Sequence, residues 1–245
     1  MSFKPSKKLA TYIHKIQTET GRKIVIERTT ELGLGMLSAL EDHPRYILVR
    51  IALDRQGRRI TEQEIEYSIA HEITHGFLIY KEGYCQAVFQ RPTSNTERKT
   101  VSLLLTMIDD IVVNKIIYDN GFSPFSPLYL SMVEHEIRAA QRGIDIYNRL
   151  SSDPLVKNSY MVSRYITAWS ILEYFELERD ERYILRAFLE SFQGLYPEQY
   201  EMADQIKAIV MHHDIFTPRG HCETIEQILR LWGLGDLVKL ETINH

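Results

Sequence analysis

The sequence predicts an α+β fold that is predominantly helical. One observation is the apolar, β-branched run at residues 46–53, which indicates a strand early in the chain. Another is that apolar residues recur mostly at helical spacing from Thr61 onward. The composition fits a folded core, since 44% of the 245 residues are hydrophobic and 25% are charged. We therefore expect a small mixed β-sheet near the N-terminus and a helical remainder.

The first sixty residues are expected to contain one helix and several strands. Residues 5–20 have the apolar spacing of an amphipathic helix, which Gly21 would end. Residues 23–28 have the composition of a short strand, and residues 33–40 are compatible with a second one. Residues 46–53 give the strongest strand pattern of all, because they are apolar and β-branched and are bounded by turn-forming residues.

A capped helix is predicted over residues 62–82. Thr61 and Glu64 match a capping box, in which each side chain accepts a hydrogen bond from the other residue's backbone N–H. Apolar side chains then follow at helical spacing, namely Ile65, Ile69, Ile73 and Phe77. Gly83 is well placed to end the helix, because glycine readily adopts the left-handed conformation of a C-cap.

The rest of the chain is expected to be helical after one loop. Residues 84–95 are predicted to be irregular and residues 96–118 to form a second long helix. The middle of that helix, residues 103–117, is apolar almost all round, so we expect it to be central in the fold. Four or five further helices should follow, with breaks near residues 152–154, 196–197 and 217–220.

Charge and hydropathy exclude several functions. The 29 basic and 33 acidic residues give a formal net charge of −4, whereas phosphate binding needs a basic surface. The N-terminal lysines are not followed by the apolar run of a signal peptide. No stretch reaches the roughly 18 apolar residues of a membrane span. We therefore expect a cytoplasmic protein with neither nucleic acid nor a membrane as partner.

The cysteine content points to a reducing compartment. Cys85 and Cys222 are too few for a disulfide framework, and we expect them to be two buried thiols. Neither has a second cysteine nearby in the sequence, so a zinc site built on thiolates is not expected.

Two histidines carry most of the functional information. His71 and His75 are four residues apart on the predicted helix 62–82, which puts both imidazoles on one face and within reach of a single Zn²⁺. Glu72 is rotated from them by about 100° around the helix. It is badly placed as a third ligand, but it can reach a zinc-bound water and act as the general base.

The third zinc ligand is expected on the helix 96–118. Asp109 and Asp110 stand in its apolar middle, where carboxylates are rare unless they are paired or bound to metal. We favour Asp110, because Asn114 lies one turn further on the same face and could accept a hydrogen bond from the second nitrogen of a zinc histidine. Asp109 is the alternative ligand. The aspartate that does not bind zinc should make a hydrogen bond or salt bridge to another helix.

This pattern resembles the zincin metallopeptidases, and within them the gluzincin type. The resemblance rests on His71-Glu72-Ile73-Thr74-His75 and on an acidic residue in a later helix. The chain departs from the gluzincin pattern, because Asp110 stands where that type has Glu and Asn114 where it has Asp. The resemblance implies a zincin-like N-terminal half in which the strand 46–53 lines the cleft. A peptide substrate could then pair in extended form with the neighbouring sheet edge.

The domain organisation follows from this reading. We expect residues 1–122 to form a zincin-like metal-site region. Residues 123–245 would form a helical region that packs on it as one compact unit.

Other residues offer weaker candidates. A side chain that stabilises an oxyanion could come from Tyr80, Tyr84, Tyr118, Tyr129, His135 or Arg138. His135 is also an alternative third zinc ligand. The group of His212, His213, Asp214 and His221 beside Cys222 could hold a second metal, although an ordinary polar loop and helix end is the better interpretation.

The sequence therefore predicts a zinc-dependent hydrolase, and specifically a metallopeptidase acting on a peptide or protein. The alternative is a zinc-binding module that regulates or recognises another protein without cleaving it. Glu72 favours the enzyme, because a site that only binds zinc does not need a base. Nothing in the sequence indicates the oligomeric state or the cleavage specificity.

Overall fold

The computed structural model describes residues 4–30, 32, 38–41, 45–52, 54–55 and 58–242. The chain forms two compact units. The first comprises residues 1–83, 113–128 and 244–245, and the second comprises residues 84–112 and 129–243. This division differs from the predicted regions 1–122 and 123–245 mainly in residues 84–112, which group with the second unit.

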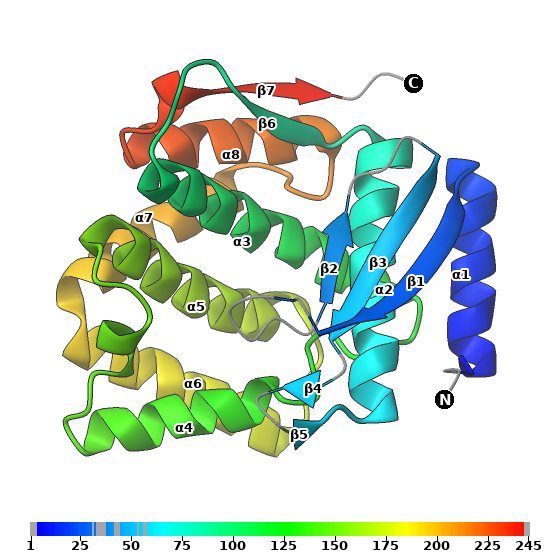
Figure 1. Ribbon diagram of the computed structural model, residues 1–245. Helices are drawn as coiled ribbons and strands as arrows, with labels where there is room; N and C mark the ends of the chain where they lie inside the picture. Colours follow the sequence, from blue (N-terminus) through cyan, green and yellow to red (C-terminus); the bar gives the residue numbers. More distant parts are fainter. Residues whose placement is uncertain are drawn as a thin grey trace. The chain divides into compact units, whose positions relative to one another are not determined.

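A three-stranded mixed sheet lies in the first unit, in the order β1-β3-β2 (Figure 1). The strand β1 (Lys23–Thr29) runs parallel to β3 (Tyr46–Ala52), and β2 (Ser38–Glu41) pairs with β3 in antiparallel register. The central strand β3 is mostly buried, whereas β2 is an edge strand. The prediction of a small mixed sheet is confirmed. Residues 33–37, part of the segment compatible with a second strand, lie outside the described residues.

A two-residue pairing continues the chain after this sheet. The strand β4 (Asp54–Arg55) pairs in antiparallel register with β5 (Arg58–Arg59).

Two helices accompany the sheet. The helix α1 (Lys7–Thr20) begins at Ser6, whose hydroxyl accepts a hydrogen bond from a backbone N–H, and ends at Gly21 with a φ of 66°. The helix α2 (Glu62–Phe77) begins with the expected capping box. Figure 1 shows α1 beside α2, and α2 running along the strands β2 and β3. The predicted helix 62–82 is correct in extent, but its last turn is a π-helix, η2 (Leu78–Glu82), before Gly83.

Gly76 lets α2 approach the central strand closely. A Cβ atom at this position would lie 3.0 Å from both Cγ2 and Cδ1 of Ile47, which is on β3. A methyl group there would therefore require the buried side chain of Ile47 to shift by a few tenths of an ångström. Because His75 is the preceding residue, this contact also sets how the end of the predicted metal-binding segment sits on the sheet.

The second unit consists mainly of helices. The helix α3 (Asn95–Asp119) crosses from this unit into the first one, and its middle is buried, with Met107, Ile108 and Ile111 at most 1% exposed. Five further α-helices follow among the described residues, with a short 3₁₀ turn, η3 (Ile146–Arg149), before the second of them. They are α4 (Tyr129–Gln141), α5 (Pro154–Tyr174), α6 (Arg179–Leu195), α7 (Pro197–His212) and α8 (Pro218–Leu231).

The predicted helix breaks near residues 152–154, 196–197 and 217–220 are confirmed, because α5, α7 and α8 each begin with a proline. Proline suits the first turn of a helix, where its missing N–H is not needed. The break between α5 and α6 was not predicted, because no proline or glycine marks it.

The prediction that residues 84–95 are irregular is wrong for the first part of that segment. Cys85–Phe89 form the strand β6, which pairs in antiparallel register with β7 (Val238–Thr242) close to the C-terminus, after the 3₁₀ turn η4 (Gly235–Leu237). The two strands are far apart in the sequence, so neither shows the local turn signal of a hairpin.

The architecture as a whole is α+β and predominantly helical, as the sequence predicts. Among the described residues, no helix combines the length and the apolar character that spanning a membrane requires.

Candidate metal centre

The imidazoles of His71 and His75 converge on one side of α2. Their Nε2 atoms are 3.2 Å apart, and the two rings meet edge to face. Two nitrogens bound at about 2.0–2.1 Å to a tetrahedral zinc would lie roughly 3.3 Å apart. The helical spacing that motivated the prediction thus brings the two nitrogens to the separation that one zinc ion requires.

A tyrosine orients the first of these imidazoles. The hydroxyl of Tyr67 lies 3.4 Å from Nδ1 of His71 and donates a hydrogen bond of 3.3 Å to Oδ1 of Asn114. Because its proton points to Asn114, the Tyr67 oxygen accepts from Nδ1–H of His71. That tautomer leaves the lone pair of the His71 imidazole on Nε2, the atom that faces His75.

Asn114 was expected to accept a hydrogen bond directly from a zinc histidine. The structure places the hydroxyl of Tyr67 between them instead. Tyr67 was not singled out from the sequence. The signal was available, since Tyr67 stands four residues before His71 and therefore on the same face of the helix.

Asp110 is the third member of the group. One ligand atom from each of His71, His75 and Asp110 lies within 4.8 Å of the other two. Asp110 stands one turn before Asn114 on the unbroken helix α3, and Asn114 is already joined to His71 through Tyr67. Asp110 therefore lies close to His71 because it is on the same helix as Asn114, one turn away.

Asp109 is engaged elsewhere. Its Oδ1 atom lies 2.8 Å from Nε2 of His221, a residue of α8. This contact is the bond to another helix that was expected of the aspartate not bound to zinc. Consecutive aspartates on α3 therefore belong to two different clusters.

Glu72, the expected general base, is held by the edge strand. The hydroxyl of Ser38 on β2 donates a hydrogen bond of 2.7 Å to Oε1 of Glu72. Ser38 was not identified from the sequence, because it lies in the segment whose secondary structure was ambiguous. Its contact fixes one oxygen of the carboxylate while the side chain remains partly exposed.

The donor set suits a zinc ion that takes part in chemistry. Two imidazoles and one carboxylate are a set found in catalytic zinc sites, which leave a fourth position open. All three side chains are partly exposed, so that position is not closed off by complete burial. The residues present therefore fit the metal that the sequence predicts.

The other predicted candidates have different surroundings. Tyr84 donates a hydrogen bond of 2.8 Å to the backbone carbonyl of Phe216, and Arg138 forms an ion pair with Glu134 on α4. His135 is exposed on α4 and is not a member of the candidate metal-binding groups found among the described residues.

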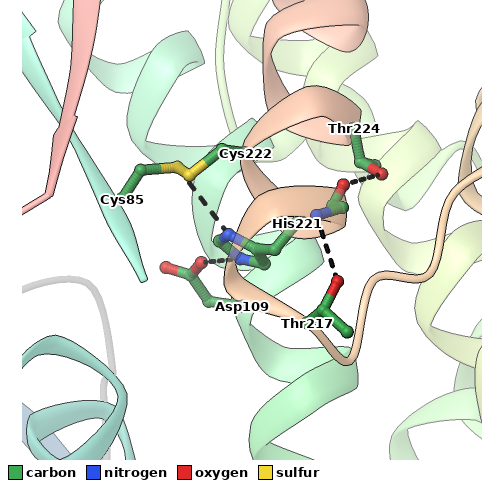
Figure 2. The surroundings of a disulfide bond; sticks show 7 residues. Cys85, Asp109, Thr217, His221, Cys222 and Thr224 are labelled. Atoms are coloured by element: carbon green, nitrogen blue, oxygen red, sulfur yellow. Dashed lines mark hydrogen bonds and ion pairs between the residues drawn. A yellow bond between two sulfur atoms is a disulfide. The ribbon is translucent and has the colours of Figure 1, made fainter. Parts of the chain in front are cut away.

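A second cluster lies in the second unit and corrects the expectation for the cysteines. Cys85 and Cys222 form a disulfide bond instead of remaining two thiols. Figure 2 shows the imidazole of His221 between this disulfide and Asp109. Nδ1 of His221 lies 3.8 Å from Sγ of Cys85, and its side chain is completely buried.

The neighbouring histidines do not join this cluster. His213 contacts Gln227 through Nε2 at 2.8 Å and Glu223 through Nδ1 at 3.4 Å. His212 stacks edge to face on His213. Of the group suggested by sequence proximity, His221 alone is found with Cys222 in a candidate metal-binding group of described residues, and Cys85 completes it.

Comparison with known proteins gives no relative: no protein-family model, curated protein or solved structure matches the chain.

Proposed function

We propose that the protein is a zinc-dependent hydrolase, specifically a metallopeptidase, with His71, His75 and Asp110 as zinc ligands. The observation that carries the proposal is the 3.2 Å separation of the two Nε2 atoms, with the carboxylate of Asp110 in the same group. A bound zinc would supply a water of lowered pKa and polarise a substrate carbonyl.

Other side chains of the protein would carry out proton transfer and orient the reacting groups. Glu72 would take a proton from the attacking water and pass it to the leaving nitrogen. Ser38 orients that carboxylate, and Tyr67 would hold His71 in the tautomer whose Nε2 lone pair can bind the ion.

A peptide is the substrate that best fits the surroundings of Glu72. The carboxylate is bonded to Ser38 on β2, an edge strand of the sheet β1-β3-β2. An extended peptide paired with an edge strand gains backbone hydrogen bonds irrespective of its sequence. Such a peptide would pass beside Glu72. A cytoplasmic location and the absence of a nucleic-acid partner complete the proposal, the latter because of the net charge of −4.

Zinc content and peptide hydrolysis test this proposal together. The measurements use oxidised protein, in which the Cys85–Cys222 disulfide is intact, so that thiols do not contribute zinc. Elemental analysis should give about one zinc per chain in the unaltered protein and in Glu72→Gln, but little in His71→Ala. Hydrolysis of a mixed peptide library should be lost in both variants.

Glu66→Gln is the matched control for Glu72→Gln. Glu66 lies on the same helix but bonds Ser6 at the start of α1, so this variant should keep both zinc and activity. Stoichiometric zinc without hydrolysis of any peptide library would contradict the enzyme hypothesis and favour the alternative, a zinc-binding module that does not cleave its partner. A protein that neither contains nor takes up zinc would overturn both.

The two aspartates provide a separate test of the ligand set. Asp110→Asn should weaken zinc binding strongly, because a charged ligand becomes neutral. Asp109→Asn should retain zinc at this site, because Asp109 bonds His221. The opposite result would show that Asp109 is the ligand.

A further inference from the structure

We propose that Cys85, Cys222 and His221 form a second zinc site when the protein is reduced, and that the disulfide is the oxidised, metal-free state of the same site. One ligand atom from each of these three residues lies within 4.8 Å of the other two. All three residues belong to the second unit, so the site does not depend on the His71–His75 centre.

The imidazole of His221 is arranged as a metal ligand. The carboxylate of Asp109 accepts a hydrogen bond of 2.8 Å from Nε2–H of His221. This tautomer leaves the Nδ1 lone pair directed at the sulfur of Cys85, 3.8 Å away. A carboxylate that bonds the outer nitrogen of a zinc histidine is a common way to fix its tautomer and orientation.

The distances suit zinc once the sulfur atoms separate. At zinc–sulfur and zinc–nitrogen lengths of about 2.3 and 2.0–2.1 Å, a tetrahedral site places sulfur about 3.6 Å from nitrogen and the two sulfurs about 3.8 Å apart. The observed separation of 3.8 Å between Cys85 Sγ and His221 Nδ1 is close to the first value. The Cα atoms of the two cysteines are 5.7 Å apart, so a modest rotation of each side chain provides the second.

Local packing holds the histidine in place. The backbone N–H of His221 donates to the carbonyl of Thr217, the N-cap residue of α8 (Figure 2). The ring of Tyr84 lies edge to face on the imidazole. At Gly220, a Cβ atom would lie 2.1 Å from the backbone oxygen of Asp214, so only glycine fits immediately before His221. The imidazole is therefore positioned before any metal binds.

A reductant can reach the disulfide at Cys222 from the surface of the protein. Cys85 is 6% exposed, whereas Cys222 is partly exposed and lines a surface cavity of about 460 Å³. A thiolate of a dithiol reductant would attack the sulfur of Cys222, and the electron pair of the broken S–S bond would leave on Cys85. The second thiol of the reductant then displaces Cys222, so that the reductant becomes a disulfide and two cysteine thiols remain, with two electrons and two protons transferred.

Zinc binding to these thiols involves no further electron transfer. The ion displaces one proton from each thiol to the solvent and binds two thiolates and the neutral imidazole. A water completes the tetrahedral set. Reoxidation by a disulfide oxidant would release the ion, which links metal content in this unit to the thiol–disulfide balance of its surroundings.

The test uses full-length His71→Ala, in which the first centre cannot contribute. Reduced, oxygen-free protein should bind about one zinc per chain, and oxidised protein none. Cobalt in place of zinc should give the strong ultraviolet charge-transfer absorption that thiolate ligands produce, and oxidation should abolish it. His71 and His75 lack sulfur, so this absorption reports the second site whether or not the first one binds metal.

Matched variants assign the ligands. Cys85→Ser, Cys222→Ser and His221→Ala should each lower the cobalt affinity at least ten-fold. His213→Ala, eight residues before His221 and outside the cluster, should leave it unchanged. A folded, fully reduced His71→Ala protein, with both thiols titratable, that binds neither zinc nor cobalt overturns the proposal. That result does not depend on whether any cysteine variant folds.

Discussion

The hydroxyl of Ser38 donates a 2.7 Å hydrogen bond to Oε1 of Glu72, and this contact joins the edge of the sheet to the active-site helix of the proposed hydrolase. The carboxylate is therefore oriented by a strand to which an extended peptide could pair. Substrate pairing along β2 and the placement of the base are thereby linked through a single side chain.

Ser38→Ala should reduce peptide hydrolysis without loss of zinc. The variant removes one hydrogen bond, worth about 0.5–1.5 kcal/mol, from the group that must be oriented in the transition state. The expected fall in kcat is thus about two- to ten-fold. Steady-state kinetics with a fixed peptide and elemental analysis of the same sample measure the two effects. Loss of zinc in this variant would contradict the proposal that Ser38 acts only by orienting the carboxylate of Glu72.

Tyr67→Phe should weaken zinc binding while the fold is kept. The variant removes the hydroxyl between Nδ1 of His71 and Asn114, and loss of such an outer partner typically costs 10–100-fold in affinity. Competition with a chelator gives the dissociation constant. Tyr183→Phe, at a side chain that is 73% exposed, is the control and should bind zinc like the unaltered protein. An unchanged affinity in Tyr67→Phe would mean that His71 is oriented by something else.

The sequence allows prediction of the features that depend on neighbours along the chain. The capping box at Thr61 and the prolines that begin α5, α7 and α8 act within one or two helical turns, so local sequence suffices. The proximity of His71 and His75 follows in the same way from the geometry of a helix.

Features that depend on distant segments could not be predicted. The strand β6 exists because β7 pairs with it, and the partner of Cys85 is 137 residues away along the chain. The contact of Ser38 with Glu72 can be recognised only when β2 is known to lie beside α2. In each case the local sequence is compatible with several conformations, and a tertiary contact selects one of them.

Gly76→Ala should destabilise the protein by about 1–3 kcal/mol, because its methyl group would overlap Ile47 at the contact between α2 and β3. Urea unfolding measures the change. Gly194→Ala is the matched control, since that helical glycine has open space around its Cβ position, and this variant should gain about 0.5–1 kcal/mol.

The partner of Gly76 can be tested by a double variant. Ile47→Ala makes room for the methyl group, so Gly76→Ala should cost less in that background than in the unaltered protein. Equal costs in both backgrounds would mean that the destabilisation does not come from this contact.

Tyr12→Phe should flatten the alkaline loss of stability. Burial raises the pKa of the Tyr12 hydroxyl from 10.0 to about 12, although its hydrogen bond with Thr74 lowers it in part. The unfolded chain therefore loses this proton first. The stabilising contribution is complete below pH 10 and disappears as the pH rises through about 12, with an upper limit of about 2–3 kcal/mol.

Urea unfolding between pH 10 and pH 12 measures this effect. In Tyr12→Phe the free energy of unfolding should fall less steeply with pH than in the unaltered protein, because residue 12 then has no proton to lose. Other buried tyrosines contribute equally to both proteins, so the difference between the two slopes isolates Tyr12. Identical slopes would show that this hydroxyl titrates alike in the folded and unfolded chains.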